Sequence, residues 1–281
     1  MTQDRIHIIA HDATGVEAVM AETRHSFARH SHETFGIGVI YRGAQKSLSG
    51  RGMVEAGAGN VITVNPREIH DGHPIGDGPR GWNMLYFDPD LIRDAAYDMT
   101  DGRSGDYEFT RPVITSPAVA HCFNALFAAI TQANSPSNSQ TAALRREEML
   151  FLLLHHAIII PGSPDHPRNR SSNRADATIA RAKTMIDDAP EENLSLADLA
   201  NAAGLSRFQT VRHFTRATGL TPHAYIIQRR LDLARRLIAT GTPLAEVAAT
   251  AGFADQSHLN RHFIRAYGLS PGRYAKALLA N

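Results

Sequence analysis

The sequence predicts an α+β fold in two domains, an antiparallel β-barrel with two helices followed by an all-α domain. Two observations support this prediction. Short apolar segments separated by turn residues fill the first part of the chain, which is typical of antiparallel barrels and sandwiches. After a segment rich in proline and serine, apolar residues recur at helical spacing. Hydrophobic residues at 43% and charged residues at 20% exclude a disordered or fibrous chain.

Five segments in the first part of the chain have the composition of β-strands. Glycine-rich turns separate them, and no long helical pattern lies between them. We expect strands at Arg5–Ile9, Glu17–Ala28, Phe35–Tyr41, Asn60–Val64 and Trp82–Phe87.

Two amphipathic helices follow the predicted barrel. The first has apolar residues at three- and four-residue steps, namely Val119, Cys122, Phe123, Leu126, Phe127 and Ile130. The second spans Thr141–Ile160 and carries a face of Met149, Leu152, Leu153 and His156. Because this end of the helix is too apolar to be left in water, we expect it to pack on the barrel or on a partner subunit.

The segment 161–174 contains three prolines, three serines and no large apolar residue, which predicts an exposed linker. We therefore expect a barrel domain at residues 1–160, a linker at 161–175 and a helical domain at 176–281. Charge divides in a similar way. Residues 1–204 hold 18 basic and 25 acidic side chains, whereas residues 205–281 hold 11 and 3. A basic C-terminal part indicates a polyanionic partner such as nucleic acid, although a solvated arginine-rich surface would give the same count.

The C-terminal part contains an internal repeat. Leu196–Leu205 resembles Leu244–Phe253, and Ser206–Pro222 aligns without a gap to Asp255–Pro271. Each copy reads as a short helix, a glycine turn and a second helix, so the sequence predicts two helix-turn-helix units at about 196–217 and 244–267. Apolar spacing predicts one long connecting helix at about 222–240. If each second helix enters a major groove, the two units could read sites about one turn, ~34 Å, apart.

These residues resemble the AraC/XylS family of bacterial transcription regulators over about 178–277. The signature lies in Gly252–Phe263 and Gly268–Pro271 of the second unit. The resemblance implies sequence-specific binding to double-stranded promoter DNA, regulation of transcription through RNA polymerase, and a homodimer.

The resemblance also assigns contacts with DNA. The residues expected to contact bases are Phe208, Val211 and Arg212 in the first unit, and Gln256, Ser257, His258, Asn260 and Arg261 in the second. Arginine can pair with guanine, asparagine or glutamine with adenine, and apolar side chains can touch a thymine methyl group. The residues expected to contact phosphates, which position the protein without specifying sequence, are Arg207, Arg216, Arg229, Arg230 and Arg265.

The first domain resembles the cupin-type ligand-binding and dimerisation domain common in this family. The segments that carry the resemblance are Phe27–His32, Ile40–Gly43, Gly57–His70 and Leu85–Leu91. It implies a small-molecule effector site inside the barrel. The candidate pocket residues are His30, His32, Tyr41, His70 and Trp82, with Arg42 as a further candidate.

His30, His32 and His70 also resemble the metal ligands of cupin enzymes, and imidazole suits zinc, iron, nickel or copper. The carboxylate that those enzymes use would fall here at Gly36 or Ile37. We therefore expect a regulator that is not an enzyme and needs no cofactor. Two alternatives stay open: a metal-responsive regulator that uses the three histidines, and a cupin enzyme with a DNA-binding tail.

The remaining sequence features concern the compartment. The single cysteine, Cys122, excludes an internal disulfide. The first residues lack the pattern of a signal peptide. The most apolar stretch, Met149–Ile160, contains two histidines and is shorter than the ~20 residues of a membrane span. We expect a cytoplasmic protein with no membrane partner.

Overall fold

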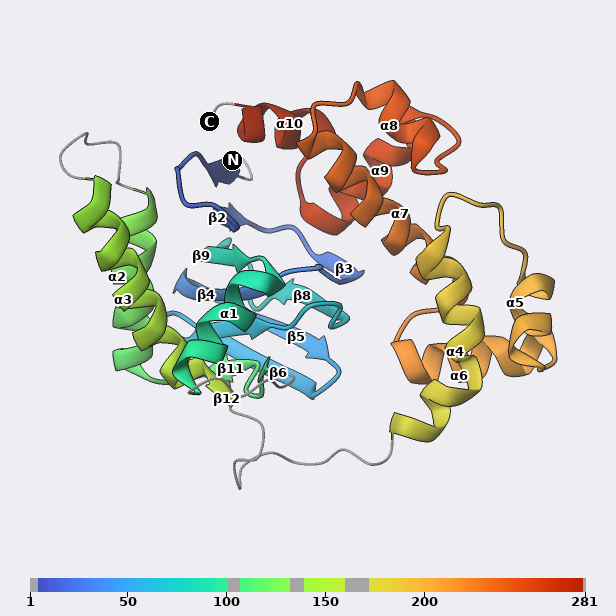
Figure 1. Ribbon diagram of the computed structural model, residues 1–281, viewed down its shortest axis with the longest axis horizontal. Helices are drawn as coiled ribbons and strands as arrows, with labels where there is room; N and C mark the ends of the chain where they lie inside the picture. The colour runs from blue at the N-terminus through green and yellow to red at the C-terminus, as the bar shows by residue number, and fades with distance from the viewer. Residues whose placement is uncertain (1–4, 101–106, 132–138, 160–171, 280–281) are drawn as a thin grey trace. The chain divides into compact units, whose positions relative to one another are not determined.

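A computed structural model describes residues 5–100, 107–131, 139–159 and 172–279 (Figure 1). The chain divides into two compact units, Met1–His166 with Ala277–Asn281, and Pro167–Lys276. Antiparallel sheets belong to the first unit and helices make up the second, which confirms the predicted α+β class. Most of the predicted linker, 161–175, lies outside the described residues, and a helix begins at Ser172.

The first unit is built around a six-stranded antiparallel sheet. In order across the sheet, its strands are β1 (Arg5–Ile9), β2 (Val16–Thr23), β9 (Arg80–Phe87), β4 (Phe35–Arg42), β7 (Val61–Val64) and β11 (Val113–Ile114). The central strand β4 is buried on both faces from Phe35 to Ile40. Phe35, Ile37 and Val39 face the helices of this unit, and the residues between them face the opposite way.

A second antiparallel sheet covers that opposite face. Its strands, in order, are β3 (Phe27–His30), β8 (His70–Pro74), β5 (Ala44–Ser49) and β6 (Gly52–Gly57). Trp82 and Tyr86 project from β9 toward this sheet, where their rings contact Phe27 and His32. The two sheets therefore enclose an interior lined by aromatic and imidazole rings. A short pair, β10 (Glu108–Phe109) with β12 (Ile158–Ile159), completes the described strands.

Three strands of the second sheet are not predicted by the sequence pattern. β5 and β6 form a hairpin, and β8 pairs with β5. Their sequences are rich in glycine and polar residues, so they lack the apolar alternation that identifies strands. The structure also divides the expected strand Glu17–Ala28 into β2 and β3, which belong to different sheets. The other four predicted strands are confirmed.

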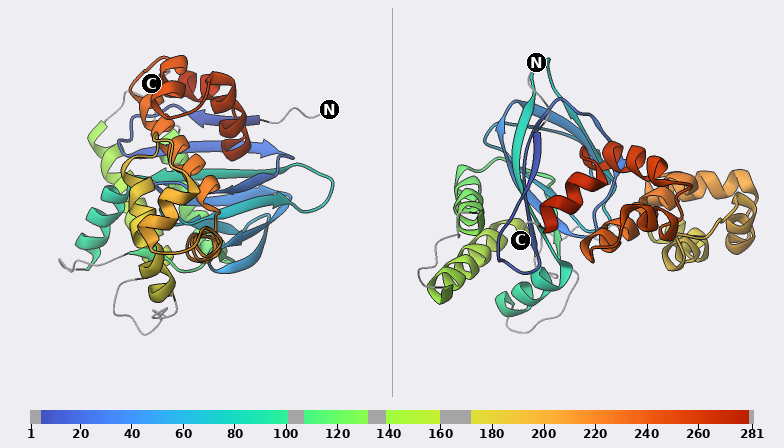
Figure 2. Two further views of the ribbon diagram at one scale, coloured as in Figure 1. Left: turned by 90° about the vertical axis from the view of Figure 1, so that its right-hand side faces the viewer. Right: turned by 90° about the horizontal axis from the view of Figure 1, so that it is seen from above.

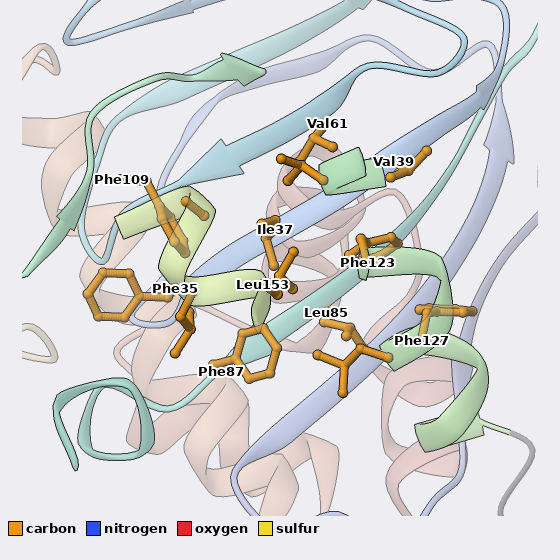
Figure 3. Close-up of a cluster of buried hydrophobic side chains, with 14 of the residues drawn as sticks. Phe35, Ile37, Val39, Val61, Leu85, Phe87, Phe109, Phe123, Phe127 and Leu153 are labelled. Carbon is orange, nitrogen blue, oxygen red and sulfur yellow. The ribbon is translucent and has the colours of Figure 1, made fainter. Parts of the chain in front are cut away.

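Three helices pack on the outer face of the six-stranded sheet. They are α1 (Pro89–Met99), α2 (Pro117–Thr131) and α3 (Ser139–Ala157), and α2 and α3 lie side by side (Figures 1 and 2). Phe123 of α2 and Leu153 of α3 point toward Ile37 and Leu85 of the sheet (Figure 3). All four side chains are fully buried, so this layer forms the core of the first unit.

The buried face of α3 differs from the expected one. Leu153, Leu154 and Ala157 are buried, whereas Leu152 is 57% exposed and His156 is also exposed. The apolar run in this helix extends around its circumference, so the spacing alone does not select the face that meets the sheet. An exposed leucine thus remains on the outer side of α3.

The second unit is helical throughout its described residues. Its helices are α4 (Ser172–Asp188), α5 (Leu196–Ala203), α6 (Arg207–Thr218), α7 (Pro222–Ala239), α8 (Leu244–Thr250), α9 (Gln256–Tyr267) and α10 (Pro271–Leu279). The helices α5 and α6 form the first predicted helix-turn-helix, α8 and α9 form the second, and α7 is the long connecting helix. No helix in the described part of the chain has the length and apolar character needed to cross a membrane.

Local signals explain why these helices begin and end where they do. Ser195 and Ser206 each form a capping box at the start of α5 and α6. Gly204 ends α5 with φ of 64° and Gly252 follows α8 with φ of 77°, a left-handed conformation that glycine adopts without steric cost. The two glycines therefore form the turns of the two units.

Candidate functional site

The two second helices, α6 and α9, each have one buried face and one exposed face. Thr210 and Phe214 are buried on α6, and Leu259, Phe263 and Ala266 are buried on α9. These residues fix the orientation of each helix on the unit. The opposite faces are exposed and therefore accessible to a partner.

Most of the residues predicted to contact DNA lie on the exposed faces. The exposed ones are Arg207, Phe208, Arg212 and Arg216 on α6, and Gln256, Ser257, Arg261 and Arg265 on α9. Val211 and Asn260 are half-buried. Phe208 is 77% exposed, which is unusual for an aromatic side chain and leaves its ring accessible to a partner. Each helix thus combines side chains that can contact bases with arginines that can contact phosphates.

His258 has a second role beside its predicted contact with a base. Its backbone N–H donates to Asp255 Oδ1 at 2.6 Å, and its ring Nδ1 accepts from the backbone N–H of Ala254 at 3.3 Å. The ring also packs against Phe253 and His262, with centroid separations of 5.4 and 4.7 Å. His258 therefore stabilises the turn that starts α9.

Two of the five predicted phosphate contacts are wrong, because Arg229 and Arg230 are buried in α7. Arg229 pairs with Asp232 at 2.5 Å and lies over the ring of Tyr225, with 5% of its surface exposed. Asp232 also accepts from Gln228 Nε2 at 3.0 Å. A guanidinium in this network cannot reach a phosphate.

Arg230 is buried because it binds backbone carbonyl groups. Its Nε donates to Pro190 O at 2.8 Å, and one Nη donates to Glu192 O at 3.0 Å. The other Nη donates to Gly252 O in the turn of the second unit. The side chain thus links the segment before α5 to the turn between α8 and α9. It holds the two helix-turn-helix units on the connecting helix.

In the first unit, His30, His32 and His70 come together inside the sheets. His30 and His70 face each other across the β3–β8 pair, with ring centroids 4.6 Å apart. The His32 ring lies 4.9 Å from the first and 5.3 Å from the second. One ligand atom from each residue lies within 4.8 Å of the others. His30 and His32 are 6% exposed, so the cluster is largely removed from water.

Backbone contacts orient this cluster. His30 Nδ1 lies 2.7 Å from Ala28 O, and His70 Nδ1 lies 2.9 Å from Glu68 O, so each ring places a nitrogen against a carbonyl acceptor. Arg67 N–H donates to His32 O at 2.6 Å, with a left-handed φ of 62° at Arg67. Burial lowers the pKa of the His70 imidazole, outweighing the carboxylate of Glu68, so this ring is neutral near pH 7.

Of the other predicted pocket residues, Trp82 belongs to this interior and Tyr41 does not. Trp82 reaches the cluster through Phe27, whose ring lies 5.9 Å from Trp82 and 6.1 Å from His30. Tyr41 lies near the end of β4, on the outer face of the sheet. It is 43% exposed, and its hydroxyl donates to Ala21 O at 3.1 Å. Arg42 is exposed and pairs with Glu22.

Tyr86 also belongs to this interior, although it is not among the predicted pocket residues. Its ring lies 4.8 Å from that of His32. The signal was present, because Tyr86 stands four residues after Trp82 on the same strand and therefore on the same face. Gly36, one of the two positions at which a cupin enzyme would carry a carboxylate, faces this interior too. A Cβ added there would lie 2.5 Å from Val64 Cγ2 and 2.7 Å from Met84 Cε. The space is thus filled by neighbouring side chains.

Comparison with known proteins agrees with both parts of this description. The family profile of the AraC-like ligand binding domain matches residues 15–154, and that of a helix-turn-helix domain matches residues 199–277. The chain belongs to the AraC family. This AraC-family regulator combines a ligand-binding first unit with a helix-turn-helix DNA-binding second unit.

Individual relatives are also named as transcription regulators. The chain is 25% identical to the uncharacterized HTH-type transcriptional regulator YbfI of Bacillus subtilis over 83% of this chain and 81% of that protein. It is 31% identical to the transcriptional activator NphR of Rhodococcus over 62% of this chain and 51% of that protein. Its fold is similar to that of ToxT from Vibrio cholerae, solved bound to an unsaturated fatty acid. The TM-score is 0.57 at 12% identity, over 97% of this chain and 99% of ToxT.

Proposed function

We propose that this AraC-family regulator binds promoter DNA as a homodimer and that an effector in the barrel interior controls this binding. The observation that carries the proposal is the division of α6 and α9 into a buried face and an exposed face rich in arginine. Exposed arginines supply the electrostatic part of DNA affinity, and the polar and aromatic side chains beside them supply selectivity.

For the DNA contacts, we propose that α6 and α9 enter the major groove. Gln256, Asn260 and Arg261 would contact base edges from α9, and Arg212 would do so from α6. Phe208 and Val211 would touch a thymine methyl group or a sugar. Phosphate contacts would come from the exposed arginines Arg207, Arg216 and Arg265.

For the effector, we propose a small molecule that contacts the rings of His30, His32, His70 and Trp82. These side chains offer polar nitrogen atoms and an indole face within one largely buried interior. ToxT carries an unsaturated fatty acid in one of its structures, which supports an apolar component in the effector. The effector would act by binding more tightly to one arrangement of the dimer than to another.

For the assembly, we propose that α3 contributes to the homodimer contact through the exposed side of the helix around Leu152. A Leu152→Glu variant should then shift the sedimentation of the protein toward the monomer. We further infer that the regulator meets RNA polymerase at the promoter in the cytoplasm. A non-enzymatic role is supported by the side chains that crowd Gly36, one of the two positions expected for the carboxylate of a cupin enzyme.

The proposal is tested by comparing wild type with Arg261→Ala. Genome-wide mapping of bound DNA first identifies the promoter, and the operons beside it point to the class of effector. Arg261→Ala should then weaken binding to that promoter by about 1 to 3 kcal/mol, because it removes one base contact. Binding to unrelated DNA should change much less. Unchanged promoter affinity would count against the placement of α9 in the groove.

A further inference from the structure

We propose that His30, His32 and His70 bind one divalent transition-metal ion of the zinc class. This inference deepens the effector site and rests on the proposed placement of that site in the barrel interior. It follows from the arrangement of the three imidazoles, which come from two paired strands and the segment after the first of them.

The spacing of the three side chains matches a metal site that needs only small adjustments. Zinc bonds to histidine nitrogen of ~2.0–2.1 Å place tetrahedral ligand atoms about 3.4 Å apart. The three ligand atoms here already lie within 4.8 Å of one another. Side-chain rotations that move the ligand atoms by about 1 Å would close the site around an ion. Three protein ligands leave a fourth tetrahedral position, which a water molecule would fill.

The hydrogen bonds of two rings select the nitrogen that a metal would use. In His30 and His70, Nδ1 lies within hydrogen-bond distance of a backbone carbonyl oxygen and donates to it. In the neutral ring, Nε2 then carries the lone pair. Metal-binding histidines commonly have this outer hydrogen bond, because it fixes the tautomer and the orientation of the ring.

The backbone around the cluster is held in place before any ion binds. His30 and His70 lie opposite each other in the pairing of β3 with β8. The hydrogen bond from Arg67 N–H to His32 O joins the segment after β3 to the loop before β8. The Asn65 side chain and backbone both donate to Glu68 Oε2 at 2.9 and 3.2 Å, which closes the loop before His70. A site with this support loses little freedom when it binds an ion.

The test measures metal binding by the full-length protein, without a histidine tag and in the absence of DNA. Protein stripped with a chelator is titrated with zinc chloride in a calorimeter, and with cobalt chloride followed by visible absorption. We expect one zinc ion per chain and the intense cobalt absorption of a four-coordinate site. His32→Ala should weaken zinc binding by at least about 100-fold, because it removes a direct ligand. His70→Gln should have the same effect.

The matched control is His73→Ala. His73 lies on the same strand as His70, its side chain is 40% exposed, and it is not part of the cluster. This variant should bind zinc as wild type does. If a cluster variant fails to fold by near-ultraviolet circular dichroism, the cobalt spectrum of wild type still decides the matter. Absence of stoichiometric binding in wild type, or equal binding in folded His32→Ala, would overturn the proposal. Promoter binding is a separate measurement, so its failure in Arg261→Ala leaves this test intact.

Discussion

The guanidinium of Arg230 packs directly on Gly252, and it donates a hydrogen bond to the carbonyl oxygen of that glycine. A Cβ added at Gly252 would lie 2.9 Å from Arg230 Nε and 2.6 Å from Glu191 O. The connecting helix, the turn of the second helix-turn-helix and the segment before α5 therefore meet around one side chain. The guanidinium of this arginine thus binds carbonyl groups inside the DNA-binding unit instead of a partner outside it.

Arg230→Ala should accordingly lower the stability of the protein. The substitution leaves the carbonyl groups of Pro190, Glu192 and Gly252 without their donor, and we expect a loss of about 3 kcal/mol in the free energy of unfolding. Urea unfolding followed by circular dichroism measures this loss. Arg212→Ala is the matched control, because Arg212 is exposed on α6. It should change stability by less than about 0.5 kcal/mol and weaken DNA binding instead. Equal stability of the two variants would refute the structural role of Arg230.

Arg216→Gln should reduce the salt dependence of DNA binding. Arg216 is exposed in the last turn of α6, where we propose a phosphate contact. Loss of one phosphate contact lowers the slope of log affinity against log salt by about 0.9. Binding isotherms at several salt concentrations measure the slope on promoter and unrelated DNA. Arg229→Gln gives the contrast, because its buried partner Asp232 excludes a phosphate contact and predicts an unchanged slope. A slope unchanged by Arg216→Gln would remove this contact from the proposal.

Gly38→Ala should disrupt the central pair of strands in the first unit. A Cβ at Gly38 would lie 2.4 Å from the backbone oxygen of Asn83 and 2.5 Å from Met84 Sδ. The backbone atom cannot move without breaking the pairing of β4 with β9, so we expect a cost of about 3 kcal/mol. Gly57→Ala serves as control, since nothing lies within 4 Å of its added Cβ. Thermal unfolding of the two variants provides the comparison, and equal midpoints would contradict the close approach at Gly38.

His262 should make the DNA-binding unit less stable in acid. Burial lowers the pKa of its imidazole below 6.5, and the positive charges of His258, His223, Arg265 and Arg261 act in the same direction. As pH falls below 6.5, the unfolded chain takes up a proton before the folded one does. The free energy of unfolding therefore decreases until the folded pKa is passed.

Nuclear magnetic resonance titration of the His262 ring protons measures this pKa directly, with His262→Gln to assign the signals. The variant should also lose part of the difference in stability between about pH 7.5 and about pH 5.5. A midpoint at or above 6.5 would contradict the expected direction.

The helices of the DNA-binding unit could be predicted from the sequence because their signals are local. Ser195 and Ser206 provide caps, and a repeat marks the two units independently of any long-range contact. The structure also brings together the three histidines that the sequence proposed as one site. Spacing on a strand places His30 and His32 near each other, and the barrel resemblance supplies the third.

Other features could not be predicted because they depend on long-range partners. Both faces of β4 are buried, so the local sequence does not show on which face of the sheet Tyr41 lies. The acceptors of Arg230 are backbone carbonyl groups far away in the sequence, which leave no trace in the charge pattern. The hairpin of β5 and β6 is stabilised by strand pairing, which its glycine-rich sequence does not predict.

The two glycine turns predict that the two copies of the repeat differ in which residues they accept at the turn. Nothing lies within 4 Å of a Cβ added at Gly204, so asparagine, which tolerates the left-handed conformation, could replace it at modest cost. At Gly252 the added carbon would meet both a backbone oxygen and the Arg230 side chain. In a saturation library selected for promoter binding, position 204 should therefore return several residues and position 252 glycine alone. The two copies of the repeat therefore tolerate different side chains at equivalent positions.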